Sequence, residues 1–424
     1  MNKTGEFKSP EEKNAVIETI RKQLLGKKLS YREIYTLMDS IAKQKLGDVL
    51  TTYFAASSYS RGFSNEELYY FTKAMVETGE KLTFKGIVAD KHSIGGLPGT
   101  RTTFIVVPIV AAAGFTIPKS SSRAITTPSG TADDMEVLSK VIFTKEQIYK
   151  IVRDTNGCIV WGGSFNIAPA DDVIIQIEEP LLFESFDKIV ISIMAKKVAF
   201  GSNHIVIDIP YGEGVKVHRI KDAEILKVKF EYLAKRFNMK IKCLISKTDQ
   251  PIGRGIGPIL ETREAIRVLQ QKENRPLDLE KRSLTLAGSL LDLCLEDSPK
   301  EYKNGLEWAT HILRSNLAFV KMKEIIKAQG GNPNIDSEDL KPGKFEAVVL
   351  SHKKGVVKKI NSQNATIIAK ILGAPGQKRS GIFLNKKIGE PVFEKEILYT
   401  LYSENVYNLK EAKSSLRQFP IVLM

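Results

Sequence analysis

Two short stretches of the sequence place basic and hydroxyl side chains around glycines. The first, KHSIGGLPGTRTT, covers residues 91–103, and the second, SSSRAITTPSGT, covers residues 120–131 and contains seven hydroxyl side chains. Ammonium, hydroxyl and backbone N–H groups are donors that can hold an oxyanion, and glycine lets the backbone approach it closely. We therefore expect a phosphate-binding site. Tight turns that carry surface hydroxyls are the simpler alternative.

Apolar runs on either side of these stretches indicate the elements that position them. Residues 86–89 are expected to form a strand before the first stretch, and the run from Phe104 to Ala113 is expected to form a buried helix after it. Residues 113–118 would form the next strand. Strand, glycine-rich turn and helix is the order that points N–H groups and the positive end of a helix at an anion. Both stretches would then follow strands, where open α/β sheets bind their ligands.

The rest of the chain predicts an α/β fold with three parts. Helical spacing and helix-start signals at Ser9, Ser30 and Ser64 indicate a small all-helical domain in residues 1–82. The buried runs HIVIDI (204–209) and MKIKCLIS (239–246) alternate with helical patterns, which predicts a larger doubly wound, mostly parallel α/β domain in residues 83–163 and 201–335. Short strand-like runs between glycine turns predict a β-rich C-terminal domain in residues 341–424.

The runs KHSIGGLPGTRTT and SSSRAITTPSGTADDMEVL resemble the thymidine phosphorylase family and, within it, the AMP phosphorylase branch. The resemblance extends from about Leu24 to near the C-terminus. It implies that residues 164–200 rejoin the helical domain, which is then discontinuous. It also implies a pentosyltransferase that cleaves an N-glycosidic bond with orthophosphate as co-substrate, with no further cofactor and no metal.

The resemblance leaves two substrate classes open. The expected substrate is a nucleoside 5′-monophosphate such as AMP, giving free base and ribose 1,5-bisphosphate. The alternative is a thymidine or other pyrimidine nucleoside, giving (deoxy)ribose 1-phosphate. Pyrimidine-specific relatives carry an arginine before a Ser/Lys pair that binds the base, whereas residues 176–180 read QIEEP here. This difference favours the nucleotide.

The same resemblance assigns binding roles to individual residues. Those expected to hold orthophosphate are Lys91, Ser93, Thr103, Ser121 and Thr131. Those expected to bind the nucleotide or its base are Gly96, Ser122, Arg123, Ala124, Ile125, Thr126, Thr127, Thr131, Ser192, Lys196 and Lys216. Ser192 and Lys196 have i,i+4 spacing in a predicted helix and therefore share one face of it. A solvated helix face, and an exposed turn lysine at Lys216, are the alternatives.

Two residues are expected to take part in the chemistry. His92 stands between Lys91 and Ser93, and the resemblance places it beside the base or sugar, where it would donate a hydrogen bond or balance charge. Glu184 aligns with an aspartate that serves as proton donor in the AMP phosphorylase branch. A carboxyl group protonates a leaving purine when burial raises its pKa.

Composition bears on the remaining possibilities. Three cysteines without short spacing predict reduced thiols in the cytoplasm, and no apolar run is long enough to span a membrane. The net charge is +14, and residues 341–424 hold fifteen Lys or Arg against six Glu. A nucleic-acid-binding protein on an inactive scaffold is therefore an alternative, but the lysine pairs lack interleaved aromatic residues, which favours a solvated basic face. The sequence starts without the additional N-terminal domain of AMP phosphorylases, so a homodimer is expected.

Overall fold

The computed structural model describes residues 5–178 and 185–424, without the side chains of residues 58–61 and 165. These residues form two compact units. The first unit contains residues 5–88, 162–178, 185–204 and 224–241, and the second contains residues 89–161, 205–223 and 242–424. None of the helices in the described ranges is long and apolar enough to cross a lipid bilayer.

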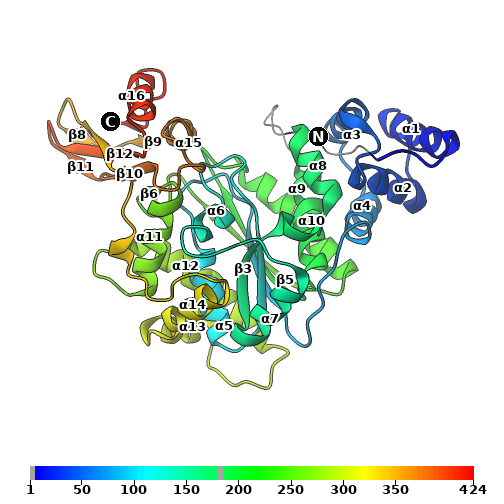
Figure 1. The fold of residues 1–424 in the computed structure, drawn as a ribbon, viewed down its shortest axis with the longest axis horizontal. Helices are drawn as coiled ribbons and strands as arrows, with labels where there is room; N and C mark the ends of the chain where they lie inside the picture. Colours follow the sequence, from blue (N-terminus) through cyan, green and yellow to red (C-terminus); the bar gives the residue numbers. More distant parts are fainter. Residues whose placement is uncertain (1–4, 179–184) are drawn as a thin grey trace. The chain divides into compact units, whose positions relative to one another are not determined.

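The first unit is helical. Its helices are α1 (Pro10–Leu24), α2 (Tyr31–Ala42), α3 (Gly47–Arg61), α4 (Asn65–Glu77), α8 (Pro169–Glu178), α9 (Phe186–Ala199) and most of α10 (Ile220–Arg236). The helix starts expected at Ser30 and Ser64 are confirmed. Each serine forms a capping box with a glutamate, Glu33 in α2 and Glu67 in α4. The apolar faces of α2 and α4 pack against α8 and α9, respectively (Figure 1).

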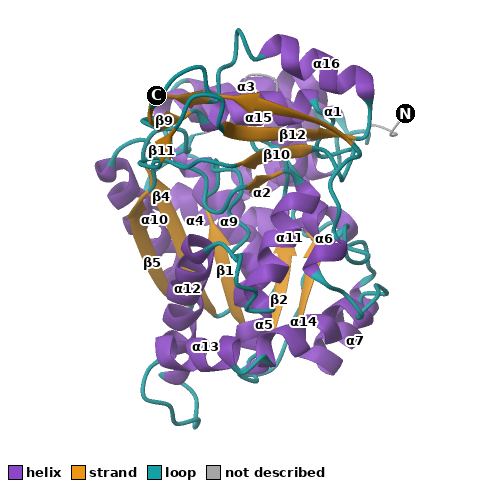
Figure 2. Ribbon diagram, turned by 90° about the vertical axis from the view of Figure 1, so that its left-hand side faces the viewer, coloured by secondary structure: helices purple, strands orange, loops and turns teal. Residues whose placement is uncertain are grey.

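The second unit contains the α/β domain. Its strands are β1 (Ala89–Ser93), β2 (Ile117–Ser121), β3 (Gly157–Trp161), β4 (His204–Tyr211) and β5 (Lys240–Lys247). Strands β1, β4 and β5 form one sheet in the order β1-β4-β5, and β2 pairs in parallel with β3. A hydrogen bond of 2.8 Å from Ala89 N to Thr116 O connects the two groups, so that β5, β4, β1 and β2 lie side by side (Figure 2).

The helices of the α/β domain enclose a fully apolar helix. The domain contains α5 (Thr103–Ala112), α6 (Thr131–Met135), α7 (Lys145–Thr155), α11 (Pro258–Leu269), α12 (Leu277–Leu295), α13 (Gly305–Arg314) and α14 (Leu317–Ala328), with the 3₁₀ turn η3 (Ser337–Asp339). The 3₁₀ turn η1 (Gly162–Phe165) belongs to the first unit. Helix α5 packs against α11, α12 and α14, and its residues 103–111 are all buried. A helix that is apolar on every side belongs in the interior. The expected buried helix is therefore confirmed.

Two strands lie further along the chain than predicted. The strand expected at residues 86–89 is β1 at Ala89–Ser93, and the strand expected at residues 113–118 is β2 at Ile117–Ser121. Both strands end in polar residues that are buried or half-buried. Hydrophobic alternation marks a strand only where its buried side chains are apolar. The predicted strands therefore ended before the buried polar residues that complete β1 and β2.

The C-terminal part has an antiparallel sheet in the order β6-β10-β12-β7. Its elements are β6 (Gly255–Ile256), β7 (Phe345–Leu350), β8 (Gly355–Val356), β9 (Lys359–Ile360), α15 (Ser362–Ile371), β10 (Gly381–Leu384), β11 (Pro391–Val392), β12 (Ile397–Ser403), α16 (Val406–Ser415) and β13 (Val422–Leu423). Strand β6 directly precedes α11 of the α/β domain, and its Ile256 pairs with Ile382 of β10. Strands β8 and β9 are separate and pair with different partners, β11 and β13.

Candidate active site

The end of strand β1 carries a buried lysine. Lys91 is only 2% exposed, and its ammonium donates a hydrogen bond to the hydroxyl of Thr102 next to the start of α5. Burial lowers the pKa of Lys91 to about 8, while the charge of Asp208 opposes that shift. A cation in such a place is poorly solvated and gains from an anionic ligand.

Ser93 is fixed by a carboxylate that sequence reasoning did not identify. Its hydroxyl donates to Asp208 Oδ2 at 2.8 Å, and Asp208 forms an ion pair with Arg282 of α12. Because side chains alternate along a strand, Lys91 and Ser93 share one face of β1 and half-buried His92 lies on the other. Asp208 is an acid inside the apolar run HIVIDI of β4, and that was the available signal.

The glycines after β1 let two predicted nucleotide-binding segments meet. Gly95 and Gly96 have φ angles of +91° and +93°. A Cβ atom at Gly96 would lie 2.7 Å from the backbone nitrogen of Lys216, whereas a Cβ at Gly95 would meet nothing within 4 Å. The structure therefore brings Gly96 and Lys216 together through a close backbone approach that a larger residue would prevent.

The second hydroxyl-rich stretch folds back on itself at the start of α6. The N–H groups of Ala124 and Gly130 both donate to the carboxylate of Asp133, at 2.7 and 3.0 Å. This closure places Thr131, the first residue of α6, beside the end of β2, where Ser121 lies. The Ser121 hydroxyl is buried without a hydrogen-bond partner among the described residues. A buried hydroxyl in that state is suited to a ligand oxygen.

Arg101 connects the two stretches. Its buried guanidinium donates to the carbonyl of Ser129 at 2.6 Å and forms ion pairs with Asp134 and with Glu261 of α11. Burial raises the pKa of Asp134 well above its usual value and raises that of Glu261 as well. The network fixes the glycine-rich turn, α6 and α11 against one another.

The predicted nucleotide-binding residues 122–127 differ in their surroundings. Ser122 and Thr126 are exposed, and Ala124, Ile125 and Thr127 are half-buried. The half-buried Arg123 guanidinium lies 4.9 Å from the centre of the Trp161 ring and 2.5 Å from a carboxylate oxygen of Glu136, so these contacts hold it in place. Lys370 of α15 donates to the carbonyl of Ile125 at 3.1 Å. The C-terminal part thus supports this loop.

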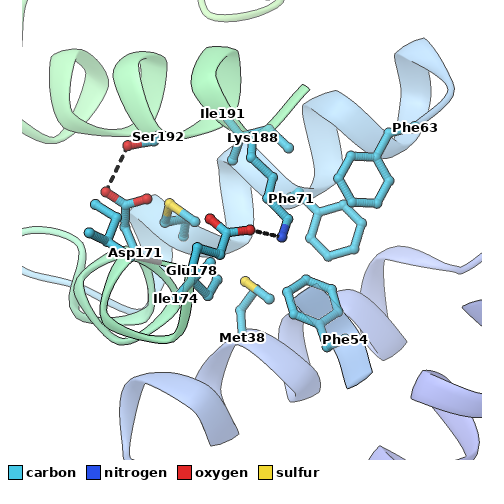
Figure 3. A pocket seen from close by; sticks show the side chains of 12 residues that line it. Met38, Phe54, Phe63, Phe71, Asp171, Ile174, Glu178, Lys188, Ile191 and Ser192 are labelled. Atoms are coloured by element: carbon cyan, nitrogen blue, oxygen red, sulfur yellow. Dashed lines mark hydrogen bonds and ion pairs between the residues drawn. The ribbon is translucent and has the colours of Figure 1, made fainter. Parts of the chain in front are cut away.

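The helical unit holds the predicted Ser192 and Lys196. Both are half-buried on α9 among buried neighbours, and the Lys196 ammonium lies 3.4 Å from the Ser192 hydroxyl. Both also contact Asp171 of α8. The Ser192 hydroxyl lies 2.8 Å from Asp171 Oδ2 (Figure 3), and the Lys196 ammonium lies 2.5 Å from the same oxygen. Sequence reasoning missed Asp171, although the Asp171–Asp172 pair in the first turn of α8 was visible. Burial raises the pKa of Asp172 to about 6.

A small cavity lies behind this group. It has a volume of about 30 Å³ and is lined mainly by apolar side chains, with the buried ion pair of Glu178 and Lys188 at one side (Figure 3). Small-molecule sites usually measure roughly 300–1,000 Å³, whereas a water needs roughly 10–15 Å³. The cavity is therefore too small to hold a nucleobase and fits one or two waters.

Two predictions, the proton donor Glu184 and the absence of a metal, are not tested by the structure. Glu184, the expected proton donor, lies outside the described residues. Among residues 5–178 and 185–424, no three His, Cys, Asp or Glu side chains are grouped closely enough to hold a metal ion.

Two family models match the chain, one in its N-terminal helical region and one in its α/β region. Residues 17–79 match the glycosyl transferase family helical bundle domain, and residues 85–319 match the a/b domain of the same family. The matched regions contain every predicted phosphate-binding residue and both residues of the Ser192/Lys196 pair.

Similar proteins include three archaeal AMP phosphorylases. Those of Methanococcus maripaludis and Thermofilum pendens are each 41% identical over 97% of this chain, covering 81% and 78% of those proteins. That of Methanocaldococcus jannaschii is 42% identical over 95% of this chain and 79% of that protein.

The fold is also similar to solved anthranilate phosphoribosyltransferases. The enzyme from Thermus thermophilus superposes with a TM-score of 0.62 at 16% identity, covering 74% of this chain and 99% of that one. The enzyme from Saccharomyces cerevisiae gives 0.57 at 15% identity, covering 75% and 98%. The predicted helical and α/β fold class is confirmed.

Proposed function

Because this chain belongs to the glycosyl transferase family with a helical bundle domain and an a/b domain, we propose that it is an AMP phosphorylase. It cleaves the N-glycosidic bond of a nucleoside 5′-monophosphate with orthophosphate and releases free base and ribose 1,5-bisphosphate. The observation that carries this conclusion is the identity of 41% to AMP phosphorylases over 97% of the chain.

Orthophosphate is the nucleophile, so the protein has to hold it and position it. An oxygen of orthophosphate attacks C1′ while the bond from C1′ to the base nitrogen breaks and its electron pair leaves with the base. Lys91, Ser93, Thr103, Ser121 and Thr131 hold the phosphate. The buried cation of Lys91 and the unpartnered hydroxyl of Ser121 support this assignment. Placing a nucleophile in a poorly solvated, charge-complementary site accounts for much of the acceleration in such reactions.

The nucleotide is bound by the remaining predicted residues. The junction of Gly96 and Lys216 and the loop of residues 122–127 take the ribose phosphate, and Ser192 and Lys196 take the base. Glu184 protonates the departing base, and His92 balances charge at the sugar. Beyond orthophosphate the reaction needs no cofactor, and the active form is a homodimer in the cytoplasm.

A substrate panel tests the proposal. The protein is incubated with orthophosphate and AMP, adenosine, CMP, uridine or thymidine, and released base is separated by chromatography. We expect base release from AMP that requires both orthophosphate and the 5′-phosphate. Activity confined to uridine and thymidine would identify a pyrimidine nucleoside phosphorylase. Salt-sensitive binding of DNA or RNA without any base release would indicate an inactive scaffold that binds nucleic acid.

A further inference from the structure

One carboxylate of α8 contacts both side chains that face the base. Asp171 is 3% exposed and accepts a hydrogen bond from Ser192 at 2.8 Å, and the Lys196 ammonium lies 2.5 Å from the same oxygen. In Figure 3, Asp171 and Ser192 point toward each other from α8 and α9. Ser192 and Lys196 are one helical turn apart, which brings their polar ends to one face of α9.

The donors and acceptors of Asp171, Ser192 and Lys196 determine the direction of each hydrogen bond among them. A hydroxyl has one donor and two acceptor lone pairs, a carboxylate only accepts, and an ammonium only donates. The proton of Ser192 is directed to Asp171, and one lone pair of the Ser192 oxygen accepts from Lys196 at 3.4 Å. The second lone pair remains, so toward a third group Ser192 can only accept. Lys196, beside it, can only donate. The face thus presents an acceptor next to a donor.

We propose that Asp171 is a positioning residue that sets the base preference, because it commits the Ser192 proton and so makes Ser192 an acceptor for an exocyclic amino group. This inference rests on the proposed function. On adenine, the 6-amino group provides the only N–H donors of the free edge, and the ring nitrogens beside it accept from Lys196. A carbonyl at the same position, as in hypoxanthine, directs lone pairs at the lone pairs of Ser192.

The proposal predicts the effect of Asp171→Asn. The asparagine amide can donate to Ser192, so the hydroxyl proton is released and can turn toward the base. One hydrogen bond of this kind corresponds to a change on the order of tenfold. We expect the ratio of kcat/KM for AMP to that for IMP to fall on the order of tenfold in Asp171→Asn. The loss with AMP should appear mainly in KM, because the phosphate-binding residues are untouched.

Asp172→Asn is the matched control. It removes the same charge at the neighbouring position, which is also close to Lys196. Asp172 does not accept the Ser192 proton, because Ser192 donates to Asp171. Its AMP to IMP ratio should equal that of the unmodified protein. Ser192→Ala provides a second measurement if Asp171→Asn fails to fold, as judged by circular dichroism. It should lose the preference for AMP over the 5′-monophosphate of purine riboside, which lacks the amino group.

The outcomes separate this inference from the proposed function. If the unmodified protein releases no base from any nucleotide, the proposed function itself fails. If the unmodified protein acts on AMP, two results together would show that the assignment of Asp171 and Ser192 is wrong. In the first, Asp171→Asn changes kcat/KM for AMP and for IMP by the same factor. In the second, Ser192→Ala keeps full discrimination against purine riboside 5′-monophosphate. A clear preference of the unmodified protein for IMP over AMP would also overturn it.

Discussion

If Lys91 holds orthophosphate as proposed, its burial in strand β1 should make phosphate binding depend on pH in a window that can be calculated. Burial lowers the pKa of Lys91 from 10.5 to about 8. Because one pKa unit corresponds to roughly 1.4 kcal/mol, keeping Lys91 charged in the ligand-free fold costs about 3 kcal/mol. Orthophosphate beside the ammonium restores a favourable charge partner and raises the pKa again.

The sign of the effect on stability follows from proton binding. Between about pH 8 and pH 10.5 the unfolded chain keeps the Lys91 proton that the folded chain has lost. The contribution of Lys91 to the free energy of unfolding therefore rises with pH across that window and is constant below it. Phosphate binding behaves in the opposite way. Above about pH 8 it must take up a proton, so the affinity should fall roughly tenfold for each further pH unit.

Isothermal titration calorimetry with orthophosphate, in buffers of different ionisation enthalpy, measures both the affinity and the proton uptake. Lys91→Met should bind orthophosphate weakly and without this pH dependence. In the absence of ligand at neutral pH, it should be more stable to urea than the unmodified protein by up to about 3 kcal/mol. Lys387→Met is the control, since burial also lowers the pKa of Lys387 outside the site. It should change stability and leave the phosphate profile unaltered. Affinity of the unmodified protein that stays constant from pH 7 to pH 10 would refute the reasoning.

Three further predictions concern the loops. Gly96→Ala should raise KM for AMP at least tenfold more than Gly95→Ala, as measured by steady-state kinetics of the two variants. Both positions have positive φ, but only a methyl group at Gly96 meets the backbone of Lys216. Arg101→Met should lower the free energy of unfolding by about 3–5 kcal/mol in urea titrations, because it leaves two buried carboxylates unpaired. Lys370→Met should raise KM for AMP by roughly two- to tenfold with KM for orthophosphate unchanged, since it removes one hydrogen bond to the nucleotide loop; equal changes in both constants would contradict a local role.

Sequence reasoning worked where one local rule decides the outcome. The capping boxes at Ser30 and Ser64, the apolar helix α5 and the buried run of β4 each follow from short patterns. The i,i+4 relation of Ser192 and Lys196 also needed only helical geometry. In each case the residues that determine the element lie within one or two turns of it.

The parts that escaped prediction depend on residues far apart in the chain. Asp208 contacts Ser93 across 115 positions, and Lys370 contacts Ile125 across 245. No spacing rule connects such pairs. Strand ends were misplaced for a related reason, since Lys91 and Ser121 are buried without being apolar. Polar groups are buried when partners or ligands compensate for lost hydration, and those partners become visible only in the folded chain.

The discontinuous helical unit has a consequence for protein synthesis. Its helices α2 and α4 pack against α8 and α9, which the ribosome makes only after the whole segment from residue 89 to 161. At about 5–20 residues per second, the interval between residue 88 and the end of α9 at Ala199 is roughly 5–20 s. During that time the faces of α2, α3 and α4 that will contact α8 and α9 lack these partners. Transiently exposed apolar surface makes a nascent chain prone to aggregation, so we expect this interval to be the vulnerable period of its synthesis.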